Sequence, residues 1–171
     1  PDVTECLDES GAEILIVING SPFELDKSDQ RLNLAVARVG EAGLPLAYIN
    51  LVGGQDELVF DGGSFVLNAD RELQLQMPDF REGLFISEWI KSDQGWSCQK
   101  GDIEPISNNK EQTFMAIYQA MVLGLKDYVK KNRFPGVILG LSGGIDSGLS
   151  AAVAVDAIGA ENVHCVMMPS P

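Results

Sequence analysis

The sequence has few of the residues that build common metal and nucleophile sites. It contains one histidine, His164, so zinc hydrolysis or Ser-His-Asp catalysis would have to rest on that residue. Its three cysteines, Cys6, Cys98 and Cys165, are widely spaced and form no CxxC pair, which argues against a disulfide framework or a cysteine-rich metal site. Reduced thiols are therefore expected, as is usual for a cytoplasmic protein.

Basic residues and long apolar runs are also scarce. Twelve Lys and Arg oppose 25 Asp and Glu, for a formal net charge of −13, whereas nucleic-acid binders usually need a basic face. No apolar run is long enough to span a membrane, and no basic segment followed by an apolar core opens the chain as in a signal peptide. We therefore expect no nucleic-acid partner and no membrane association. The chain has no initiator Met and begins in mid-pattern, which predicts an internal piece of a longer polypeptide.

The order of apolar runs and helical patterns predicts an α/β protein. Two β-branched runs read as strands buried on both faces, and the amphipathic segment between them reads as a helix that Gly43 terminates. The expected elements of this first part are a short helix within 1–11, strands at 12–19 and 45–52, a helix at 26–43, and meander strands at 58–67 and 72–77.

The character of the chain changes at residues 93–110, which are polar, lack periodicity and are predicted to be a linker. Trp89 and Trp96 near it are interpreted as packing anchors between domains. A helix follows at 111–131, with a stripe formed by Phe114, Ile117, Met121, Leu125 and Tyr128. A strand at 136–141, a helix at 147–158 and a strand at 162–168 then form a βαβ unit, the start of a parallel sheet. Cys165 and His164 are expected in the core of its second strand, and Cys6 and Cys98 are each expected to be a buried or half-buried thiol.

The glycine-rich segment "VILGLSGGIDSG" at 137–148 joins the strand to the helix of this unit. Gly143 and Gly144 let backbone N–H groups approach an anion closely, at a helix N-terminus that favours negative charge. Ser142 and Ser147 can donate hydrogen bonds to phosphate oxygens. Asp146 would repel a phosphate unless a bridging Mg²⁺ takes oxygens from both. The segment therefore indicates a metal-assisted phosphate site.

Two other interpretations of the same segment stay open. "GLSGG" at 140–144 satisfies Gly-x-Ser-x-Gly, the nucleophile elbow of serine hydrolases. That chemistry needs an acid and then a histidine downstream, and His164 already lies in the next strand. A glycine turn that only packs strand against helix is the other possibility. The segment matches neither Walker A nor Gly-x-Gly-x-x-Gly.

Ser142-Gly143-Gly144-Ile145-Asp146-Ser147 resembles the SGGxDS pyrophosphate loop of the N-type ATP pyrophosphatases. Three longer stretches, "GAEILIVINGSPFELDK", "GLPLAYINLVGGQDELVFDGGSF" and "YQAMVLGLKDYVKKNRFPGVILGLSGGIDSG", are similar to bacterial glutamine-dependent NAD synthetases over essentially the whole chain. The alternative within the same resemblance is another amidotransferase of the N-type ATP pyrophosphatase group.

The resemblance implies a fold and a division into domains. Residues 1–92 would be the C-terminal part of a nitrilase-like αββα sandwich, the glutaminase. After the 93–110 linker, residues 111–171 would be the first βαβ unit of a Rossmann-like sheet of the adenine nucleotide alpha hydrolase type, the synthetase.

The resemblance also implies an activity, the ATP-dependent amidation of deamido-NAD to NAD by a carbon–nitrogen ligase. Ammonia would come from glutamine, ATP and Mg²⁺ would be required, and the enzyme would be a cytoplasmic homo-oligomer. The family's glutaminase triad of Glu, Lys and Cys is expected upstream, so no catalytic residue is assigned in this chain and Cys6 is rejected as the nucleophile.

Binding residues are also carried over by position. The residues expected to bind ATP are Gly140, Leu141, Ser142, Gly143, Gly144, Ile145, Asp146 and Ser147. Asp146 is also the expected metal ligand. Ser21 and Lys27 match the family's glutamine-binding Ser and the basic residue six positions later. Without the resemblance, Ser21 would be interpreted as a turn serine and Lys27 as a solvated lysine at a helix start. The acidic residues Asp56, Glu57 and Asp61 receive no role.

Overall fold

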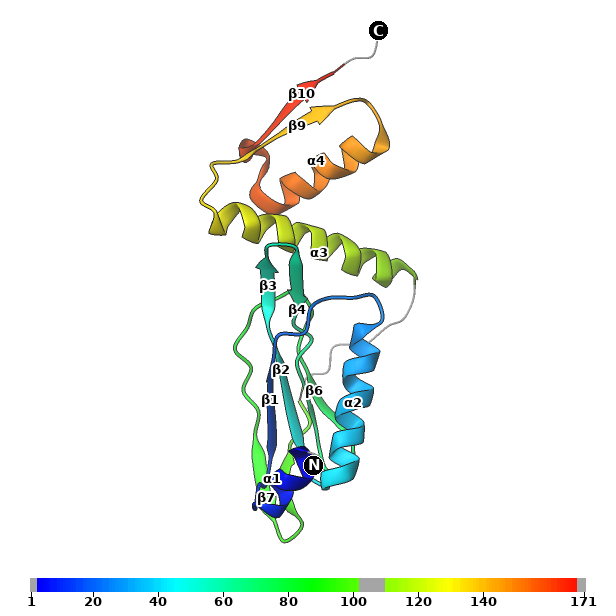
Figure 1. Ribbon diagram of the computed structural model, residues 1–171, viewed down its shortest axis with the longest axis vertical. Coiled ribbons are helices and arrows are strands. Elements are labelled where there is room, and N and C mark those ends of the chain that lie inside the picture. Colours follow the sequence, from blue (N-terminus) through cyan, green and yellow to red (C-terminus); the bar gives the residue numbers. More distant parts are fainter. Residues whose placement is uncertain (1–2, 102–109, 169–171) are drawn as a thin grey trace. The chain divides into compact units, whose positions relative to one another are not determined.

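The computed structural model describes residues 3–101 and 110–168, and it is a mixed α/β structure as expected (Figure 1). Its helices are α1 (Val3–Glu9), α2 (Lys27–Ala42), α3 (Lys110–Lys131), α4 (Ile145–Ile158) and the 3₁₀ turn η1 (Ala160–Asn162). Its strands are β1 (Leu15–Asn19), β2 (Leu46–Asn50), β3 (Val52–Gln55), β4 (Leu58–Asp61), β5 (Phe65–Leu67), β6 (Leu73–Gln76), β7 (Trp89–Ser92), β8 (Gly95–Cys98), β9 (Val137–Leu141) and β10 (Val163–Met167). Among the described residues, no helix is both long and apolar enough to cross a bilayer.

The chain forms two compact units. Among the described residues, the first contains 3–52 and 60–101, and the second contains 53–59 and 110–168. The first unit is built on a mixed sheet with strand order β1-β2-β5-β6, in which β1 and β2 are parallel and the other pairs are antiparallel. The run predicted as one strand at 58–67 is two strands, because Gly62 and Gly63, both with positive φ, interrupt it.

Helix α2 covers one face of this sheet. Its side chains at 35 and 39 are four residues apart and therefore share a face, so Ala35 and Val39 both enter the core. Gly43 ends the helix in the left-handed conformation, as the sequence predicted. The sheet contributes the other members of this core, in which the rings of Tyr48 and Phe65 stack at 4.9 Å. The buried core residues are Leu15, Ala35, Val39, Leu46, Tyr48, Phe65 and Leu67.

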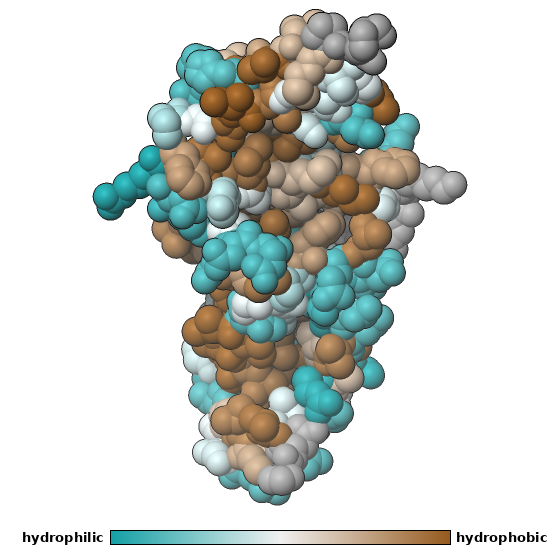
Figure 2. All heavy atoms as spheres, turned by 45° about the horizontal axis from the view of Figure 1, so that its top comes forward, coloured by the Kyte–Doolittle hydropathy of each residue, from teal (hydrophilic) through white to brown (hydrophobic). Residues whose placement is uncertain are grey.

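The opposite face of the sheet is only partly covered. Over β5 and β6, the hairpin β7–β8 packs Trp89 and Cys98 against Val66 and Leu75. On β1 the corresponding positions are open, since Ile16 and Ile18 are 68% and 85% exposed. Ile49 of β2 is exposed on the same face, and Figure 2 shows that apolar side chains gather at the molecular surface. The prediction that these strands are buried on both faces is therefore wrong for β1 within the described residues.

The segment predicted to be a linker begins with regular structure. Strand β8 at Gly95–Cys98 pairs with β7, because the turn at 93–94 closes a hairpin, and residues 102–109 lie outside the described part of the chain. Trp89 packs in the second core cluster of the first unit, and the indole N–H of Trp96 donates to Glu13 at 3.2 Å. Both contacts lie inside the first unit and hold the hairpin on its sheet.

The second unit contains the expected parallel βαβ unit. Strands β9 and β10 pair in register from Val137↔Val163 to Leu141↔Met167, and α4 connects them. Helix α3 packs on α4, but its most buried side chains are Ala120 and Val129. The stripe predicted for α3 is wrong in part, because Phe114, Met121 and Tyr128 from that stripe are exposed.

The tip of hairpin β3–β4 also belongs to the second unit, where it contacts α3. Asp127 accepts a hydrogen bond from the Gly54 backbone N–H at 2.8 Å, and the Lys131 ammonium donates to the Gly54 carbonyl. A Cβ at Gly54 would lie 3.0 Å from the Cα of Gly124, so both glycines permit this close backbone approach. The exposed turn residues Asp56 and Glu57 close the hairpin.

The single histidine and two of the cysteines do not lie where the sequence predicted. His164 and Cys165 are exposed on β10, because this strand pairs only with β9 among the described strands. Cys6 is exposed on α1, a helix with no buried residue. Only the prediction of a buried thiol at Cys98 is confirmed, at 2% exposure.

Candidate functional site

The glycine-rich turn connects the carboxyl end of β9 to the first turn of α4. Gly143 has φ +85°, a left-handed conformation that favours glycine, and no atom lies within 4 Å of the position its Cβ would take. Ser142 and Ser147 are brought together, with their hydroxyl oxygens 3.3 Å apart. The Ser147 hydroxyl donates to the Gly144 carbonyl at 2.9 Å, which closes the turn at the point where the helix begins.

The N-terminus of α4 is open to a ligand. Gly144 occupies the N-cap position and has no side chain that could accept from the first N–H groups of the helix. The first intrahelical bond runs from the Gly148 N–H to the Gly144 carbonyl at 3.2 Å. The N–H groups at 145–147 therefore precede the hydrogen-bond ladder and point out of the helix end. A helix end of this kind, with two glycines before it, can hold phosphate oxygens.

Asp146 lies in the first turn of α4 and is exposed. No group of three or more His, Cys, Asp or Glu side chains suited to a metal ion is found within the described residues. One carboxylate next to open N–H groups still fits Mg²⁺, which is commonly held by one or two carboxylates together with substrate phosphates rather than by a protein cage.

The geometry does not favour a serine hydrolase. The side-chain partner of Ser142 is Ser147, and the only histidine in the sequence is His164. His164 stands opposite Ile138 in the parallel register, whereas Ser142 follows the far end of β9. At about 3.3 Å per residue along a strand, the two lie roughly 13 Å apart. A nucleophile elbow built from these two side chains is therefore excluded.

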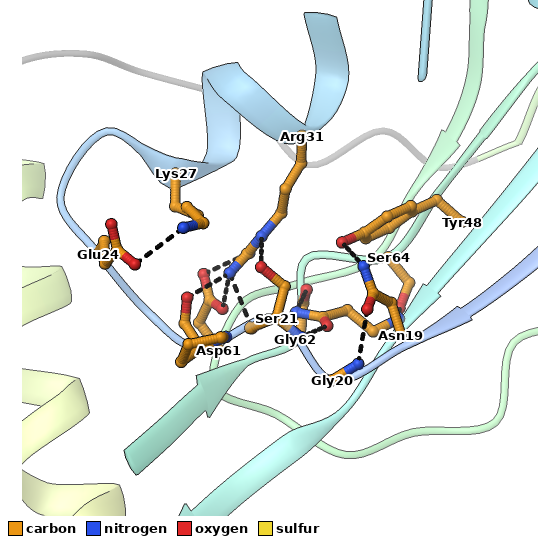
Figure 3. A network of polar contacts seen from close by, with 12 residues as sticks. Asn19, Gly20, Ser21, Glu24, Lys27, Arg31, Tyr48, Asp61, Gly62 and Ser64 are labelled. Atoms are coloured by element: carbon orange, nitrogen blue, oxygen red, sulfur yellow. Dashed lines mark hydrogen bonds and ion pairs between the residues drawn. The ribbon is translucent and has the colours of Figure 1, made fainter. Parts of the chain in front are cut away.

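The second candidate site lies in the first unit, where the chain turns from β1 toward α2. Ser21 is held from both sides (Figure 3). Its backbone N–H donates to the Asn50 side-chain oxygen at 2.9 Å, and its hydroxyl oxygen accepts from Arg31 Nε at 3.0 Å. Arg31 also donates to the carbonyls of Ser21 and Pro22, each at 2.9 Å.

Arg31 and Asp61 form an ion pair that the sequence did not reveal. Arg31 is 6% exposed and Asp61 is 2% exposed, and the guanidinium binds the carboxylate through two atoms at 2.9 and 2.8 Å. A signal was available, because Arg31 precedes Ala35 and Val39 by four and eight residues and therefore shares their buried face. A cation on a buried face requires a buried partner.

Lys27 is the first residue of α2, where its ammonium pairs with Glu24 at 2.8 Å. Figure 3 shows Lys27 pointing toward Glu24, while Ser21 points toward Arg31. The lysine side chain remains 27% exposed, so its ammonium can exchange this partner for a carboxylate of a ligand.

Tyr118 and Cys98, which lie outside both candidate sites, have raised pKa values. A hydrogen bond to Asp156 at 2.6 Å, together with partial desolvation and the charge of that carboxylate, raises the pKa of Tyr118. Burial raises the pKa of the Cys98 thiol. The raised pKa lowers the thiolate population of Cys98 and makes it a poor nucleophile.

Comparison with known proteins gives a family match within the second unit. Residues 117–171, which include the glycine-rich turn, match the family described as NAD synthase. The match begins within α3 and covers the whole βαβ unit.

Longer alignments extend the similarity over both units. The chain is 50% identical over 170 residues to the glutamine-dependent NAD(+) synthetase of Rhodobacter capsulatus, covering 99% of this chain and 30% of that protein. It is 43% identical to the enzyme of the same name from Acinetobacter baylyi, covering 95% and 29%. The chain thus spans about 30% of the length of these relatives.

Comparison with solved structures gives the same similarity. The glutamine-dependent NAD+ synthetase from Acinetobacter baumannii, in complex with ADP, matches with a TM-score of 0.85 and 44% identity over 96% of this chain and 30% of that one. The synthetase from Cytophaga hutchinsonii matches with a TM-score of 0.63 and 26% identity over 88% of this chain and 23% of that one. The resemblance expected from the sequence is therefore confirmed.

Proposed function

We propose that this chain is part of an enzyme that amidates deamido-NAD to NAD, using ATP and ammonia released from glutamine. The observation that carries the proposal is the SGGIDS turn at the carboxyl end of β9, within a stretch that matches the NAD synthase family. The similarity to glutamine-dependent NAD(+) synthetases over 99% of the chain supports the same assignment. An exposed helix N-terminus that suits phosphate is consistent with it.

The two units fit a division of labour between two domains. We propose that residues 1–92 belong to a nitrilase-like αββα glutaminase domain and residues 111–171 to a Rossmann-like synthetase domain of the adenine nucleotide alpha hydrolase type, with 93–110 between them. The exposed apolar strip at Ile16, Ile18 and Ile49 supports the first assignment, because a sandwich packs a second sheet on such a face. The parallel pairing of β9 with β10 supports the second.

In the synthetase reaction, the residues from Gly140 to Ser147 would hold the ATP phosphates. The deamido-NAD carboxylate would attack the α-phosphorus, so that a carboxyl O–P bond forms as the bond to the β-phosphate oxygen breaks and pyrophosphate leaves. Ammonia would then attack the activated carbonyl carbon and release AMP, which gives the amide. Backbone N–H groups of α4 and the hydroxyls of Ser142 and Ser147 would stabilise the charge on pyrophosphate.

Mg²⁺ would be held by Asp146 and phosphate oxygens, and when bound it would neutralise charge on the leaving group. Asp146 itself would orient the phosphates through the ion rather than contact them, since two anions repel. Because Asp146 is exposed in the first turn of α4, its carboxylate is accessible to such a ligand.

In the glutaminase half, we propose that Ser21 and Lys27 bind glutamine. A hydroxyl and an ammonium are suited to the oxygen atoms of an amino-acid substrate. The dense hydrogen bonding around Ser21 and the partial exposure of Lys27 support these roles. The enzyme is also proposed to be cytoplasmic and homo-oligomeric, as the resemblance implies.

The test uses the full-length polypeptide that carries this sequence. With ATP, deamido-NAD and ammonia, we expect NAD, AMP and pyrophosphate in equal amounts. Asp146→Ala should lower pyrophosphate release by about 100-fold or more, as is typical when a group that stabilises transition-state charge is removed. Asp156→Ala, the same change near the other end of α4, is the matched control and should retain the wild-type rate. Undiminished pyrophosphate release by Asp146→Ala would show that its assignment is wrong.

A second arm separates the alternative amidotransferases. Other amide-forming ATP pyrophosphatases would release pyrophosphate with a different carboxylate substrate. Pyrophosphate release that does not depend on deamido-NAD would therefore overturn the substrate assignment while leaving the phosphate site intact.

A further inference from the structure

The ion pair between Arg31 and Asp61 is buried more deeply than stability alone explains. Both side chains are at most 6% exposed. Removing two charges from water costs several kcal/mol for each, and replacing such a pair by apolar side chains is often neutral or stabilising. A role beyond stability is therefore worth seeking in what the pair holds in place.

The donors of Arg31 that do not serve Asp61 are directed at one point in the chain. Nε donates to the Ser21 hydroxyl oxygen at 3.0 Å, and Nη2 donates to the carbonyls of Ser21 and Pro22 at 2.9 Å. A planar guanidinium presents these donors in a fixed fork, so it fixes both the side chain and the backbone of the serine. Asp61 in turn orients the fork: its Oδ2 accepts a hydrogen bond from Nη1 at 2.9 Å, and its Oδ1 lies 2.8 Å from Nη2 as an ion-pair contact.

Asn50 holds the other side of Ser21. The asparagine is 6% exposed, accepts from the Ser21 N–H and donates to its carbonyl at 3.2 Å. The Asn50 amide also donates to the Gly62 carbonyl at 3.0 Å, which ties it to the end of β4 that carries Asp61. Backbone N–H, backbone carbonyl and hydroxyl oxygen of Ser21 therefore all have partners.

The hydroxyl hydrogen of Ser21 is the remaining polar group. Within the described residues no acceptor is recorded for it. A hydroxyl that accepts from a guanidinium is polarised, and hydrogen bonds in such a chain strengthen one another. The oxygen can no longer accept freely from a ligand, so the group is prepared to donate to an oxygen atom.

We propose that Arg31, fixed by Asp61, is a positioning residue that sets Ser21 as a hydrogen-bond donor to an oxygen of glutamine. This inference rests on the proposed binding of glutamine by Ser21. It goes beyond that assignment, because it specifies the direction of the hydrogen bond and places its control in two buried side chains 10 and 40 residues further along the chain. Breaking the pair should weaken glutamine binding although neither charge touches the substrate.

The experiment uses the full-length polypeptide with glutamine as the nitrogen source. The central variant is the double substitution Arg31→Met with Asp61→Leu, which removes both charges together and leaves no buried charge unpaired. Its KM for glutamine should rise about tenfold or more, the value of a hydrogen bond to a charged group. Arg31→Lys is the second variant. It keeps a cation for Asp61 but lacks the fork, so its KM should also rise.

Arg38→Met on the same helix is the matched control. Arg38 pairs with Glu41 at the surface, with 41% of its side chain exposed, and the KM for glutamine should remain at the wild-type value. Thermal unfolding and ammonia-driven NAD formation, which does not use glutamine, report whether each variant is intact.

A double-mutant cycle with Ser21→Ala separates positioning from a merely structural role. If Arg31 acts through Ser21, adding Ser21→Ala to the Met/Leu variant should produce no further rise in the KM for glutamine. Additive effects, or a folded Met/Leu variant with a wild-type KM, would overturn the inference. A wild-type KM for Ser21→Ala alone would overturn the glutamine-binding role of Ser21 itself, whereas a raised KM for Ser21→Ala with a normal Met/Leu variant overturns only the role of Arg31.

Discussion

Replacing Gly143 by alanine tests whether the backbone conformation of the turn before α4 is required for the proposed phosphate site. Gly143 has φ +85°, and the space around it is open, so an added methyl group would meet no neighbouring atom. The cost of the substitution is therefore confined to the backbone, and for an alanine in the left-handed region it is about 1–2 kcal/mol. The variant can avoid this strain by leaving the turn conformation when no ligand is bound.

Because the variant must take up this strained conformation again to bind ATP, the strain should lower its affinity for ATP. If the turn must return to φ near +85° to aim its N–H groups at phosphate, the full 1–2 kcal/mol is subtracted from binding, which corresponds to a rise in Kd of about 5- to 30-fold. Asparagine tolerates the left-handed region better than alanine, and a β-branched residue tolerates it worse. The affinities should therefore fall in the order Gly143, Gly143→Asn, Gly143→Ala and Gly143→Val.

The matched control is Gly148→Ala, the same substitution five residues further along. Gly148 lies within α4, and a Cβ there would also meet no atom within 4 Å. In a helix this change should stabilise by about 0.5–1 kcal/mol. Isothermal titration of ATP into the full-length protein measures the affinities, and hydrogen exchange of the α4 amides measures the helix. Wild-type affinity in Gly143→Ala, or an equal loss in Gly148→Ala, would refute the role given to the backbone conformation.

Three further predictions concern other parts of the chain. Asp127→Ala should destabilise the packing of hairpin β3–β4 on α3 by about 1.5–3 kcal/mol, because the Gly54 N–H loses its charged acceptor. Hydrogen exchange of the Gly54 amide should be slower in Asp127→Asn than in Asp127→Ala. Cys98 should resist alkylation until the protein is unfolded, since burial raises its pKa; peptide mapping that finds it modified at the rate of a free thiol would contradict this. Tyr118 should ionise above its ordinary pKa of about 10, so its hydrogen bond to Asp156 contributes fully below that pH and is lost as pH rises through the raised pKa. Ultraviolet titration should show this pKa falling toward the ordinary value in Asp156→Asn.

The conformation of the glycine-rich turn, the proposed phosphate site, could be predicted because all of its signals are local. Six contiguous residues carry the glycines, the hydroxyls and the carboxylate, and the strand and helix on either side are recognisable from composition. The structure moves only the start of the helix, from residue 147 to Ile145. A local conformation such as that of Gly143 depends on few distant contacts, so the pattern is informative by itself.

Burial was harder to predict, because it depends on which neighbours cover a strand. Ile16 and Ile18 lie in an apolar run that suggests a strand covered on both faces, yet only the face toward α2 is packed. His164 follows the same pattern on β10. An apolar composition indicates that a face requires a partner, but it does not indicate whether that partner lies within the described residues.

The Arg31–Asp61 pair could not be predicted from the sequence, because its burial is the reverse of what charged residues usually show. Its partners are 30 residues apart, and charged residues are normally assigned to the surface, so Asp61 was grouped with the acidic turn residues Asp56 and Glu57. Helical spacing is sufficient to place Arg31 on the buried face with Ala35 and Val39, although the sequence analysis did not use it. What spacing cannot supply is the identity of the buried carboxylate, which depends on the course of the chain through β4.

The two candidate sites therefore differ in what disturbs them. At the turn before α4, the donors are backbone N–H groups, so side-chain substitutions away from the turn should change phosphate binding little, while a change in φ at Gly143 acts directly. At Ser21 the donor is one hydroxyl whose direction is set by buried side chains from α2, β2 and β4. Substitution at Asp61, which has no recorded contact with Ser21, should then also weaken glutamine binding, because Asp61 orients the guanidinium that holds the serine.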